Sequence, residues 1–158
     1  MNPYSSNIDA WNQYWAGDKT GHTYSDQDTA QPALLEFWQN NLKDPLNTEN
    51  TGRVLDLACG NGALTRLVQR FKGSTKVDIS CLDASGAALD NVTASVDGVK
   101  TIKSDMHPIP LDDGTFDLVL SQFGTEYAGL DAFDEALRMV APNGKALLIM
   151  HMRGSAIE

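Results

Sequence analysis

The stretch Val54-Leu-Asp-Leu-Ala-Cys-Gly-Asn-Gly62 decides the fold. It begins with apolar residues typical of a short buried strand, and it ends where apolar residues start to recur at helical spacing over 62–72. Glycines between a strand and a helix let the backbone approach a ligand, and the free N–H groups of the helix N-terminus point to the same place. Because a Gly-x-Gly turn can also be purely structural, the prediction of a ligand site depends on the rest of the chain.

Strands and helices alternate on the carboxyl side of this turn. The expected strands are 53–59, 76–82, 99–103, 116–123 and 145–152, and the expected helices are 62–72, a helix capped by Ser85, and 131–140. A Pro-Asn-Gly turn at 142–144 separates the last helix from the last strand. This alternation predicts an α/β fold, a three-layer α/β/α arrangement around a doubly wound, mainly parallel sheet.

The first 50 residues differ in character from the rest. Pro32 suits the first turn of a helix, and the polar residues after Pro45 predict a linker. We therefore expect an N-terminal helical cap and linker at 1–50 and a core at 51–158, within one domain overall. An earlier helix carries an aromatic face, which fits either a lid over a ligand or ordinary packing against the sheet. Ile8, Trp11 and Trp15 share that face, and Tyr14 lies beside it.

Composition and charge narrow the classes of partner. The chain has 158 residues, 42% of them hydrophobic, which suits one domain with a real core. It carries 12 basic against 21 acidic residues, a net charge of −9, and its scattered bases make nucleic acid an unfavourable partner.

The apolar run at 146–150 is too short to span a membrane, and no leader-like apolar segment follows Met1. Cys59 and Cys81 lie in apolar strands, which predicts reduced buried thiols and a cytoplasmic location.

Three carboxylates fall at or near the carboxyl ends of three expected strands. Asp56 lies within the first strand, Asp83 ends the second, 21 residues after Gly62, and Asp105 follows the third. In adenosine-binding doubly wound folds, an acid at the position of Asp83 can accept hydrogen bonds from both ribose hydroxyls. Each acid alone can be an ordinary solvated loop residue, but the three together favour a ligand site.

With these features the chain resembles the class I S-adenosylmethionine-dependent methyltransferases, over roughly residues 50–152. The stretch Leu55-Asp-Leu-Ala-Cys-Gly-Asn-Gly62 looks like the first motif of that family. Leu82-Asp83-Ala84-Ser85 looks like the second motif, and Ser104-Asp105-Met106 looks like the third. The runs 108–121 and 136–144 are similar to the segments that lead into the fourth and fifth strands. The chain departs from the pattern at Ala58 and Asn143, where the family often has glycine.

The resemblance implies S-adenosyl-L-methionine as the cofactor and assigns residues to its parts. Gly60 and Gly62 would border the methionine part, Asp56 would help to hold the loop and the amino group, Asp83 would bind the ribose, and Asp105 would accept from the adenine amino group with the Met106 N–H nearby. Ser121 and Gln122 would face the methionine part and the acceptor. The full set of cofactor-binding candidates is Asp56, Ala58, Gly60, Asn61, Gly62, Asp83, Ala84, Asp105, Met106, Ser121 and Gln122. An acidic pocket suits the sulfonium cation.

Two other functions compete with methyl transfer to a small-molecule acceptor. A nicotinamide-dinucleotide oxidoreductase would need Gly-x-Gly-x-x-Gly, but a frame that starts at Gly60 places Thr65 at the third glycine. A module that binds the cofactor without turnover is the second alternative, because the resembled family continues beyond the fifth strand with another helix and two strands. We therefore expect a core truncated after strand five, whose apolar edge at 145–152 pairs with another copy in a homodimer.

The sequence assigns no catalytic base. Methyl transfer from a sulfonium depends mainly on alignment and proximity, and a base is needed only for an acceptor that must lose a proton. His22, His107 and His151 are the available histidines, and each also fits a surface or structural role. Neither the histidines nor the cysteines show the spacing of metal ligands, so no metal is implied.

Overall fold

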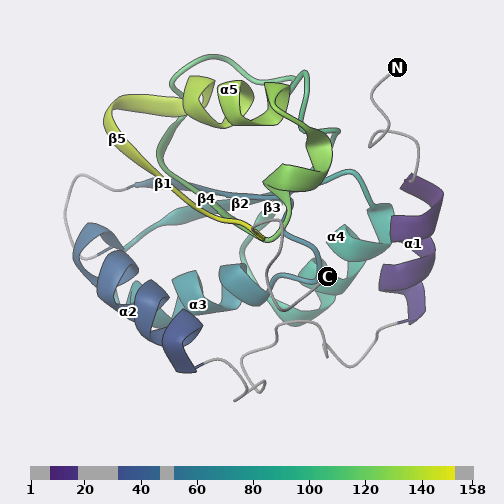
Figure 1. The fold of residues 1–158 in the computed structure, drawn as a ribbon. Coiled ribbons are helices and arrows are strands. Elements are labelled where there is room, and N and C mark those ends of the chain that lie inside the picture. Colours follow the sequence, from purple (N-terminus) through teal and green to yellow (C-terminus); the bar gives the residue numbers. More distant parts are fainter. Residues whose placement is uncertain (1–7, 18–31, 47–51, 152–158) are drawn as a thin grey trace.

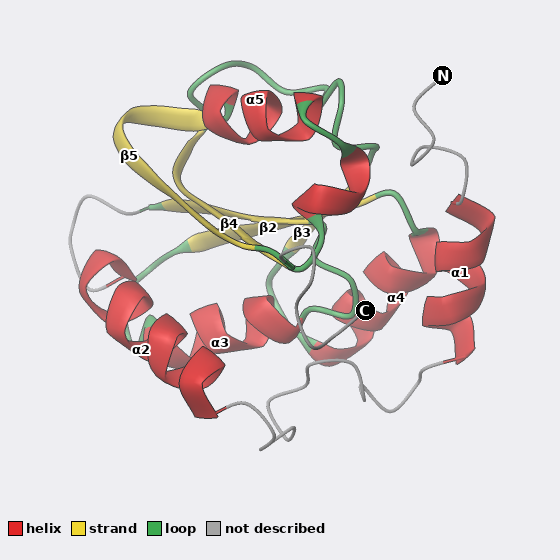
Figure 2. Cartoon of the chain, viewed as in Figure 1, coloured by secondary structure: helices red, strands yellow, loops and turns green. Residues whose placement is uncertain are grey.

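The computed structural model describes residues 8–17, 32–46 and 52–151 of the chain. Its elements form three layers, with a sheet between two layers of helices (Figures 1 and 2). In chain order they are α1 (Ile8–Gly17), α2 (Pro32–Leu46), β1 (Arg53–Leu57), α3 (Ala63–Phe71), β2 (Asp78–Asp83), α4 (Gly86–Ser95), β3 (Lys100–Lys103), β4 (Phe116–Gln122), the 3-10 helix η1 (Thr125–Ala128), α5 (Asp131–Arg138) and β5 (Val140–Ile149).

The sheet has five strands in the order β3-β2-β1-β4-β5, and each neighbouring pair is parallel. The chain moves outward from β1 through β2 to β3 and then returns to the other side of β1 with β4 and β5. The order therefore reverses between β1 and β4, which is the place where doubly wound sheets bind ligands, outside the carboxyl ends of the strands. The predicted three-layer, doubly wound parallel fold is confirmed.

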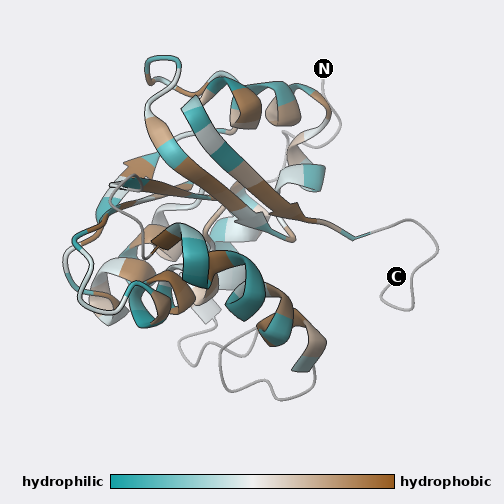
Figure 3. Ribbon diagram, turned by 90° about the vertical axis from the view of Figure 1, so that its left-hand side faces the viewer, coloured by the Kyte–Doolittle hydropathy of each residue, from teal (hydrophilic) through white to brown (hydrophobic). Residues whose placement is uncertain are grey.

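Each face of the sheet has its own apolar core. The face covered by α2, α3 and α4 includes Trp38, Leu42 and Leu46 of α2, all with no exposed surface. The face covered by α5 includes Ala132, Ala136 and Met139. Figure 3 shows hydrophobic colour concentrated on the strands, while hydrophilic and hydrophobic bands alternate along the helices. None of the helices in the described part of the chain is long and apolar enough to cross a bilayer.

The element boundaries differ from the expected ones by one to five residues, and packing explains two of these differences. The second helix runs through Pro45 to Leu46, although the sequence predicts a linker after Pro45. Leu46 is fully buried in the core beside α3, and this burial favours one further residue of helix. The fifth strand starts at Val140 rather than after the Pro-Asn-Gly turn, because Val140 pairs with Phe116 and a register shift at Phe116/Leu118 absorbs the turn residues.

The two N-terminal helices have different positions. Helix α2 packs beside α3 and is part of the core, whereas α1 packs against α4 and has no buried residue. In α1, the Asn12 carboxamide accepts a 2.8 Å hydrogen bond from the Ser85 hydroxyl, and the Trp15 carbonyl accepts one of 3.0 Å from Asn91. Helix α1 therefore lies outside the apolar core, against α4. The predicted division at residues 50 and 51 stays a prediction, and His22 and the linker lie outside the described residues.

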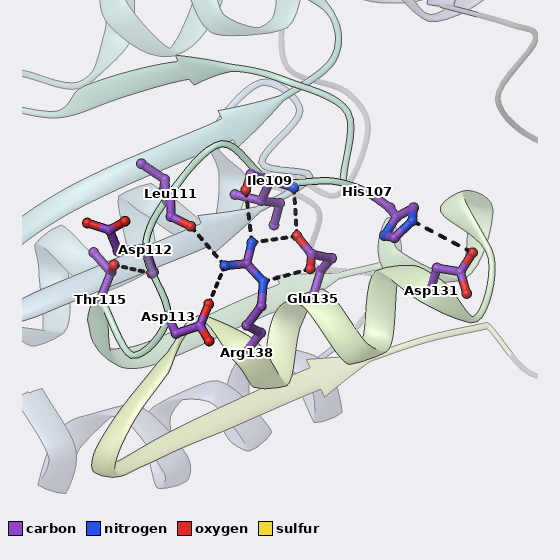
Figure 4. Close-up of polar contacts among 9 residues, drawn as sticks. All are labelled: His107, Ile109, Leu111, Asp112, Asp113, Thr115, Asp131, Glu135 and Arg138. Atoms are coloured by element: carbon purple, nitrogen blue, oxygen red, sulfur yellow. Dashed lines mark hydrogen bonds and ion pairs between the residues drawn. The ribbon is translucent and has the colours of Figure 1, made fainter.

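The loop between β3 and β4 is tied to α5 by one arginine. The Arg138 guanidinium donates to Glu135 and Asp113 at 2.7 Å and to the carbonyl oxygens of Ile109 and Leu111 at 2.8 Å (Figure 4). Arg138 holds the pKa of the Glu135 carboxyl at about 2, mainly through its hydrogen bonds. Glu135 also accepts from the Ile109 N–H at 2.6 Å. This network fixes the loop that follows Met106 and His107.

Candidate functional site

The turn between β1 and α3 approaches its surroundings closely. Gly60 and Gly62 have φ values of +51° and +82°, in the left-handed region that favours glycine. A Cβ at Gly62 would lie 3.0 Å from Val92 of α4, so the turn also packs tightly against this helix. The Cys59 N–H donates to the Leu82 carbonyl at 3.0 Å, which joins the turn to the end of β2.

Asp83 ends β2 and presents its carboxylate to the same turn. One oxygen accepts a 2.8 Å hydrogen bond from the Gly60 N–H, and the other accepts one of 2.8 Å from the Ser85 N–H. Partial burial raises the pKa of this carboxyl above its ordinary value, while these backbone donors oppose the rise. A carboxylate has about four acceptor positions, so Asp83 can still accept from a ligand's hydroxyl groups.

A cavity of about 340 Å³ lies beside Asp83, at the carboxyl ends of the strands. This volume lies within the range of small-ligand pockets. Asp83, Ala84, Asp105 and Met106 form one part of its lining, and the rest is mostly apolar or aromatic. The remaining lining residues are Ile8, Trp11, Trp15, Ala58, His107, Phe123, Gly124, Tyr127, Ala128 and Asp131.

Five of the eleven candidate site residues line this cavity, namely Ala58, Asp83, Ala84, Asp105 and Met106. Asp56 lies behind the turn: it is 1% exposed and accepts a 2.5 Å hydrogen bond from the Thr65 hydroxyl. Burial raises its pKa to about 7. Asp56 therefore holds α3 against β1, at a distance from the cavity wall.

Neighbouring candidates at the end of β4 have different surroundings. The side chain of Gln122 accepts a 2.5 Å hydrogen bond from the Trp38 indole of α2, on the sheet face away from α5. Ser121 is fully buried, and its hydroxyl has no hydrogen-bond partner among the described residues. The side-chain amide nitrogen of the buried Asn61 also lacks one there. Neither residue lines the cavity, although both lie at the carboxyl ends of strands.

Helix α1 forms one wall of the cavity. The sequence left open whether its aromatic face is a lid over a ligand or packs against the sheet. Trp11 and Trp15 both line the cavity, and neither is buried. The Trp15 indole lies directly on the glycine turn, because a Cβ at Gly60 would be 2.6 Å from its Cζ2 atom. Tyr14 contacts the Trp15 ring edge-on, with ring centroids 4.8 Å apart. The aromatic face thus covers the ligand cavity rather than filling the core.

Comparison with known proteins agrees with this geometry. The family model described as a methyltransferase domain matches residues 54–144, from the start of β1 to the turn within β5. The chain belongs to the methyltransferase domain family. The predicted membership among class I S-adenosylmethionine-dependent methyltransferases is thereby confirmed.

Individual relatives of this methyltransferase domain are distant. An uncharacterized methyltransferase of Schizosaccharomyces pombe is 29% identical over 134 residues, which cover 84% of this chain and 52% of that protein. A demethylmenaquinone methyltransferase of Staphylococcus epidermidis is 27% identical, over 72% of this chain and 49% of its own length. The chain thus spans about half the length of these curated relatives.

A solved structure supports the fold of the domain. The crystal structure of an S-adenosylmethionine-dependent methyltransferase from Mesorhizobium loti has a TM-score of 0.58 and 20% identity, over 77% of this chain and 52% of that one. At this level of identity the likeness concerns the fold. The family and the fold together imply S-adenosyl-L-methionine as the cofactor of the methyltransferase domain.

The residues present fit this cofactor. Asp83 retains acceptor positions for ribose hydroxyls, the Asn61 amide has no partner among the described residues, and the negatively charged lining suits a sulfonium cation. In the described part of the methyltransferase domain no three histidine, cysteine or acidic side chains are grouped to hold a metal ion.

Some lining residues carried little signal in the sequence. Gly124 has no left-handed backbone, yet a Cβ on it would collide with the Ala58 methyl group. Asp131 looks like an ordinary first-turn helix acid in the sequence. Their shared position at one cavity depends on contacts between segments far apart in the chain.

Proposed function

We propose that this methyltransferase domain transfers a methyl group from S-adenosyl-L-methionine to a small-molecule acceptor. The observation that carries the proposal is the position of Asp83, which joins the glycine turn through Gly60 and also lines a cavity that has aromatic side chains in its other walls. Bound S-adenosyl-L-methionine would supply an activated methyl group on a sulfonium centre. Asp83 would accept hydrogen bonds from the ribose, and Asp105 would accept from the adenine amino group.

The aromatic part of the cavity supports a small, flat acceptor. Trp11, Trp15, Phe123 and Tyr127 provide flat or edge-on contacts within a volume suited to small molecules. One relative is named for methylating demethylmenaquinone, which is a small molecule and not a macromolecule. The net charge of −9 also disfavours a nucleic-acid acceptor.

The proposal also includes a cellular location and a self-association of the protein. Both cysteines are free and buried, which supports a reducing, cytoplasmic location. Strand β5 pairs with β4 and has no second neighbour in the described part of the sheet, which supports a homodimer through its outer edge.

Calorimetry tests the cofactor. We expect binding of S-adenosylhomocysteine and no measurable binding of NAD. Asp83→Ala should weaken the adenosyl ligand by about 1.5–3 kcal/mol, because a charged acceptor for ribose donors is lost. The matched control is Asp90→Asn, since Asp90 is an exposed residue of α4 that does not line the cavity.

Three outcomes would contradict parts of this reading. Binding of NAD without S-adenosylhomocysteine would overturn the methyltransferase function, and an unchanged affinity in Asp83→Ala would overturn the ribose assignment. A screen of metabolite extracts with methyl-labelled cofactor then tests turnover. Cofactor binding with no labelled product from any extract would favour a binding module.

A further inference from the structure

Large apolar side chains that keep exposed surface gather around the opening of the cavity. Five of the nine such side chains in the described part of the chain lie there, and we call them the apolar mouth: Ile8, Trp11, Tyr14, Tyr127 and Leu130. Ile8, Trp11 and Tyr127 are 37%, 36% and 41% exposed, and all three also line the cavity. The apolar mouth is therefore continuous with the inside of the cavity.

Ring contacts join the two chain segments of the apolar mouth. The Trp11 ring of α1 meets the Tyr127 ring of η1 with centroids 5.5 Å apart, and it meets Tyr14 with centroids 5.9 Å apart. Leu130, which is 83% exposed, directly precedes Asp131, a residue of the cavity lining. Single exposed apolar residues are ordinary on a protein surface, whereas a contiguous group of them beside a cavity is typical of a binding surface.

The charge of the cavity lining disfavours one class of acceptor. Asp83, Asp105 and Asp131 line the cavity, and no lysine or arginine is among the described residues that do so. A carboxylate or phosphate group on the acceptor would lose water there without gaining a cationic partner. Asp83 and Asp105 are the proposed contacts of the cofactor's nucleoside, so the aromatic side chains and the apolar mouth remain for the acceptor.

We propose that the acceptor is an uncharged amphiphile, with a flat polar head inside the cavity and an aliphatic tail over the apolar mouth. This inference rests on the proposed methyl transfer and names the substrate class of the same site. The head contacts the aromatic lining of the cavity. The tail removes exposed surface of Tyr127 and Leu130 from water, and the hydrophobic effect stabilises the complex.

Two other occupants of the apolar mouth fit the molecule less well. A second copy of the chain would need a larger surface, because a stable protein interface uses about 20–30 residues on each side and the apolar mouth has five side chains. A lipid bilayer is disfavoured by the net charge of −9, since the anionic lipids of a membrane surface repel an acidic protein.

The test compares probes that differ in one part at a time. The whole chain is saturated with S-adenosylhomocysteine, and binding is measured by tryptophan fluorescence, because Trp11 and Trp15 line the cavity. We expect 4-octylphenol to bind about 30-fold more tightly than 4-methylphenol, since each methylene group removed from water raises the affinity about fourfold. 4-Octylbenzoate, with the same tail and a negative head, should bind about tenfold more weakly than 4-octylphenol.

Matched variants separate the tail contact from general stickiness of the probe. Leu130→Asn should reduce the gain from the octyl tail about threefold, because an apolar contact of the tail is lost. The control is Leu35→Asn, since Leu35 is a 38% exposed residue of α2 that does not line the cavity, and it should keep the whole gain. Both variants should bind 4-methylphenol like the wild type, because neither changes the cavity.

Several results would overturn the proposal. These are equal affinities for the two phenols, an undiminished tail gain in Leu130→Asn, and binding of 4-octylbenzoate as tight as that of 4-octylphenol. Without a tail gain, loss of dimers in Leu130→Asn would assign the apolar mouth to a second copy. Without a tail gain, cosedimentation of the wild type but not of Leu130→Asn with phosphatidylcholine vesicles would assign it to a lipid surface. Failure of S-adenosylhomocysteine to bind would count against methyl transfer itself, whereas its normal binding without a tail gain would count against the acceptor class alone.

Discussion

At the scale of single residues, the surroundings of Ala58 explain how the chain accommodates an alanine at a position where the resembled family often has glycine. Ala58 has a φ of +55°, a left-handed conformation that is strained for a residue with a Cβ. Its methyl group lies against Gly124, the residue that follows the aromatic Phe123, and both Ala58 and Gly124 line the cavity. The absence of a side chain at Gly124 leaves the room that the Ala58 methyl needs. The two positions therefore have to be considered as a pair.

Exchange of the small residues tests this pairing. Gly124→Ala should destabilise the domain by about 1–3 kcal/mol, because its new methyl group collides with that of Ala58. Ala58→Gly should relieve the left-handed strain and restore most of the loss in the double variant. Urea denaturation of the four proteins measures the coupling. Strictly additive effects of the two substitutions would show that the side chains do not interact.

Asp56 gives the stability of the domain a specific dependence on pH. Burial raises its pKa from 3.8 to about 7 in the folded state. Between about pH 4 and pH 7 the folded protein therefore retains a proton that the unfolded chain has lost, so this group's contribution to stability falls as the pH rises through that window. Below the window both states are protonated and the contribution no longer changes.

The variant Asp56→Asn removes this titration. Relative to the variant, the wild type should lose on the order of 2–4 kcal/mol of stability between pH 4 and pH 8. Urea denaturation at both pH values measures the difference, and acids such as Glu135 titrate in both proteins and cancel. The control is Asp90→Asn at an exposed position, which should follow the wild type. Parallel pH profiles for the wild type and Asp56→Asn would show that Asp56 ionises normally.

At the scale of elements, β5 is the strand whose surroundings are least complete. In the described part of the sheet it pairs with β4 on one side and with no strand on the other. Leu147 and Ile149 pack toward one core, and Ala146 and Leu148 toward the other, but all four remain partly exposed. An apolar edge with free backbone hydrogen-bonding groups favours pairing with another strand.

Sedimentation velocity of the 158-residue chain tests the proposed pairing. We expect concentration-dependent dimers for the wild type, with two β5 strands side by side. Ile149→Lys should shift the protein toward monomer, because it places a charge in the apolar edge. Leu137→Lys is the matched control, since Leu137 is 61% exposed on α5. A wild-type monomer at all concentrations, or equal dimerisation of the two variants, would contradict pairing through this edge.

At the scale of the whole molecule, the cavity is assembled from segments that are far apart in the chain. The acidic side comes from the ends of β2 and β3, and the aromatic side comes from the residues after β4. Helix α1, in the N-terminal part of the chain, covers both sides. Helix α1 is held by polar bonds to Ser85 and Asn91 and has no buried residue. Few apolar contacts are therefore lost when it moves, and such elements open at low free energy.

Ligand binding should order this helix. We expect amide exchange of Ile8–Gly17 to slow when S-adenosylhomocysteine binds, by up to about 100-fold at a ligand concentration about 100 times the dissociation constant. Trp15 lies on Gly60 and lines the cavity, so a ligand there adds contacts to α1. Exchange in α2 should change little, because α2 does not line the cavity. Equal protection of α1 with and without ligand would contradict its role as a cover.

The sequence alone determined the fold class, the strand–turn–helix with its glycines, and the two acids Asp83 and Asp105 that line the cavity. These features depend on local periodicity and on chain order, since parallel strands always bring their carboxyl ends to one edge. Ser85 also caps α4 as predicted, because a cap is a local hydrogen bond, here of 3.3 Å to the Ala88 N–H.

Only the tertiary structure decided which side chains meet. Ser121 and Gln122 are neighbours in the sequence, yet alternation along β4 turns Gln122 toward Trp38 of α2, on the face away from α5. Trp15 contacts Gly60 across 45 residues, Ala58 depends on Gly124, and His151 meets Glu126. Such contacts arise from long-range packing, where shape and the satisfaction of buried polar groups select among several possible partners. Periodicity along the chain assigns a side chain to one face of its element, but it does not select the partner on that face.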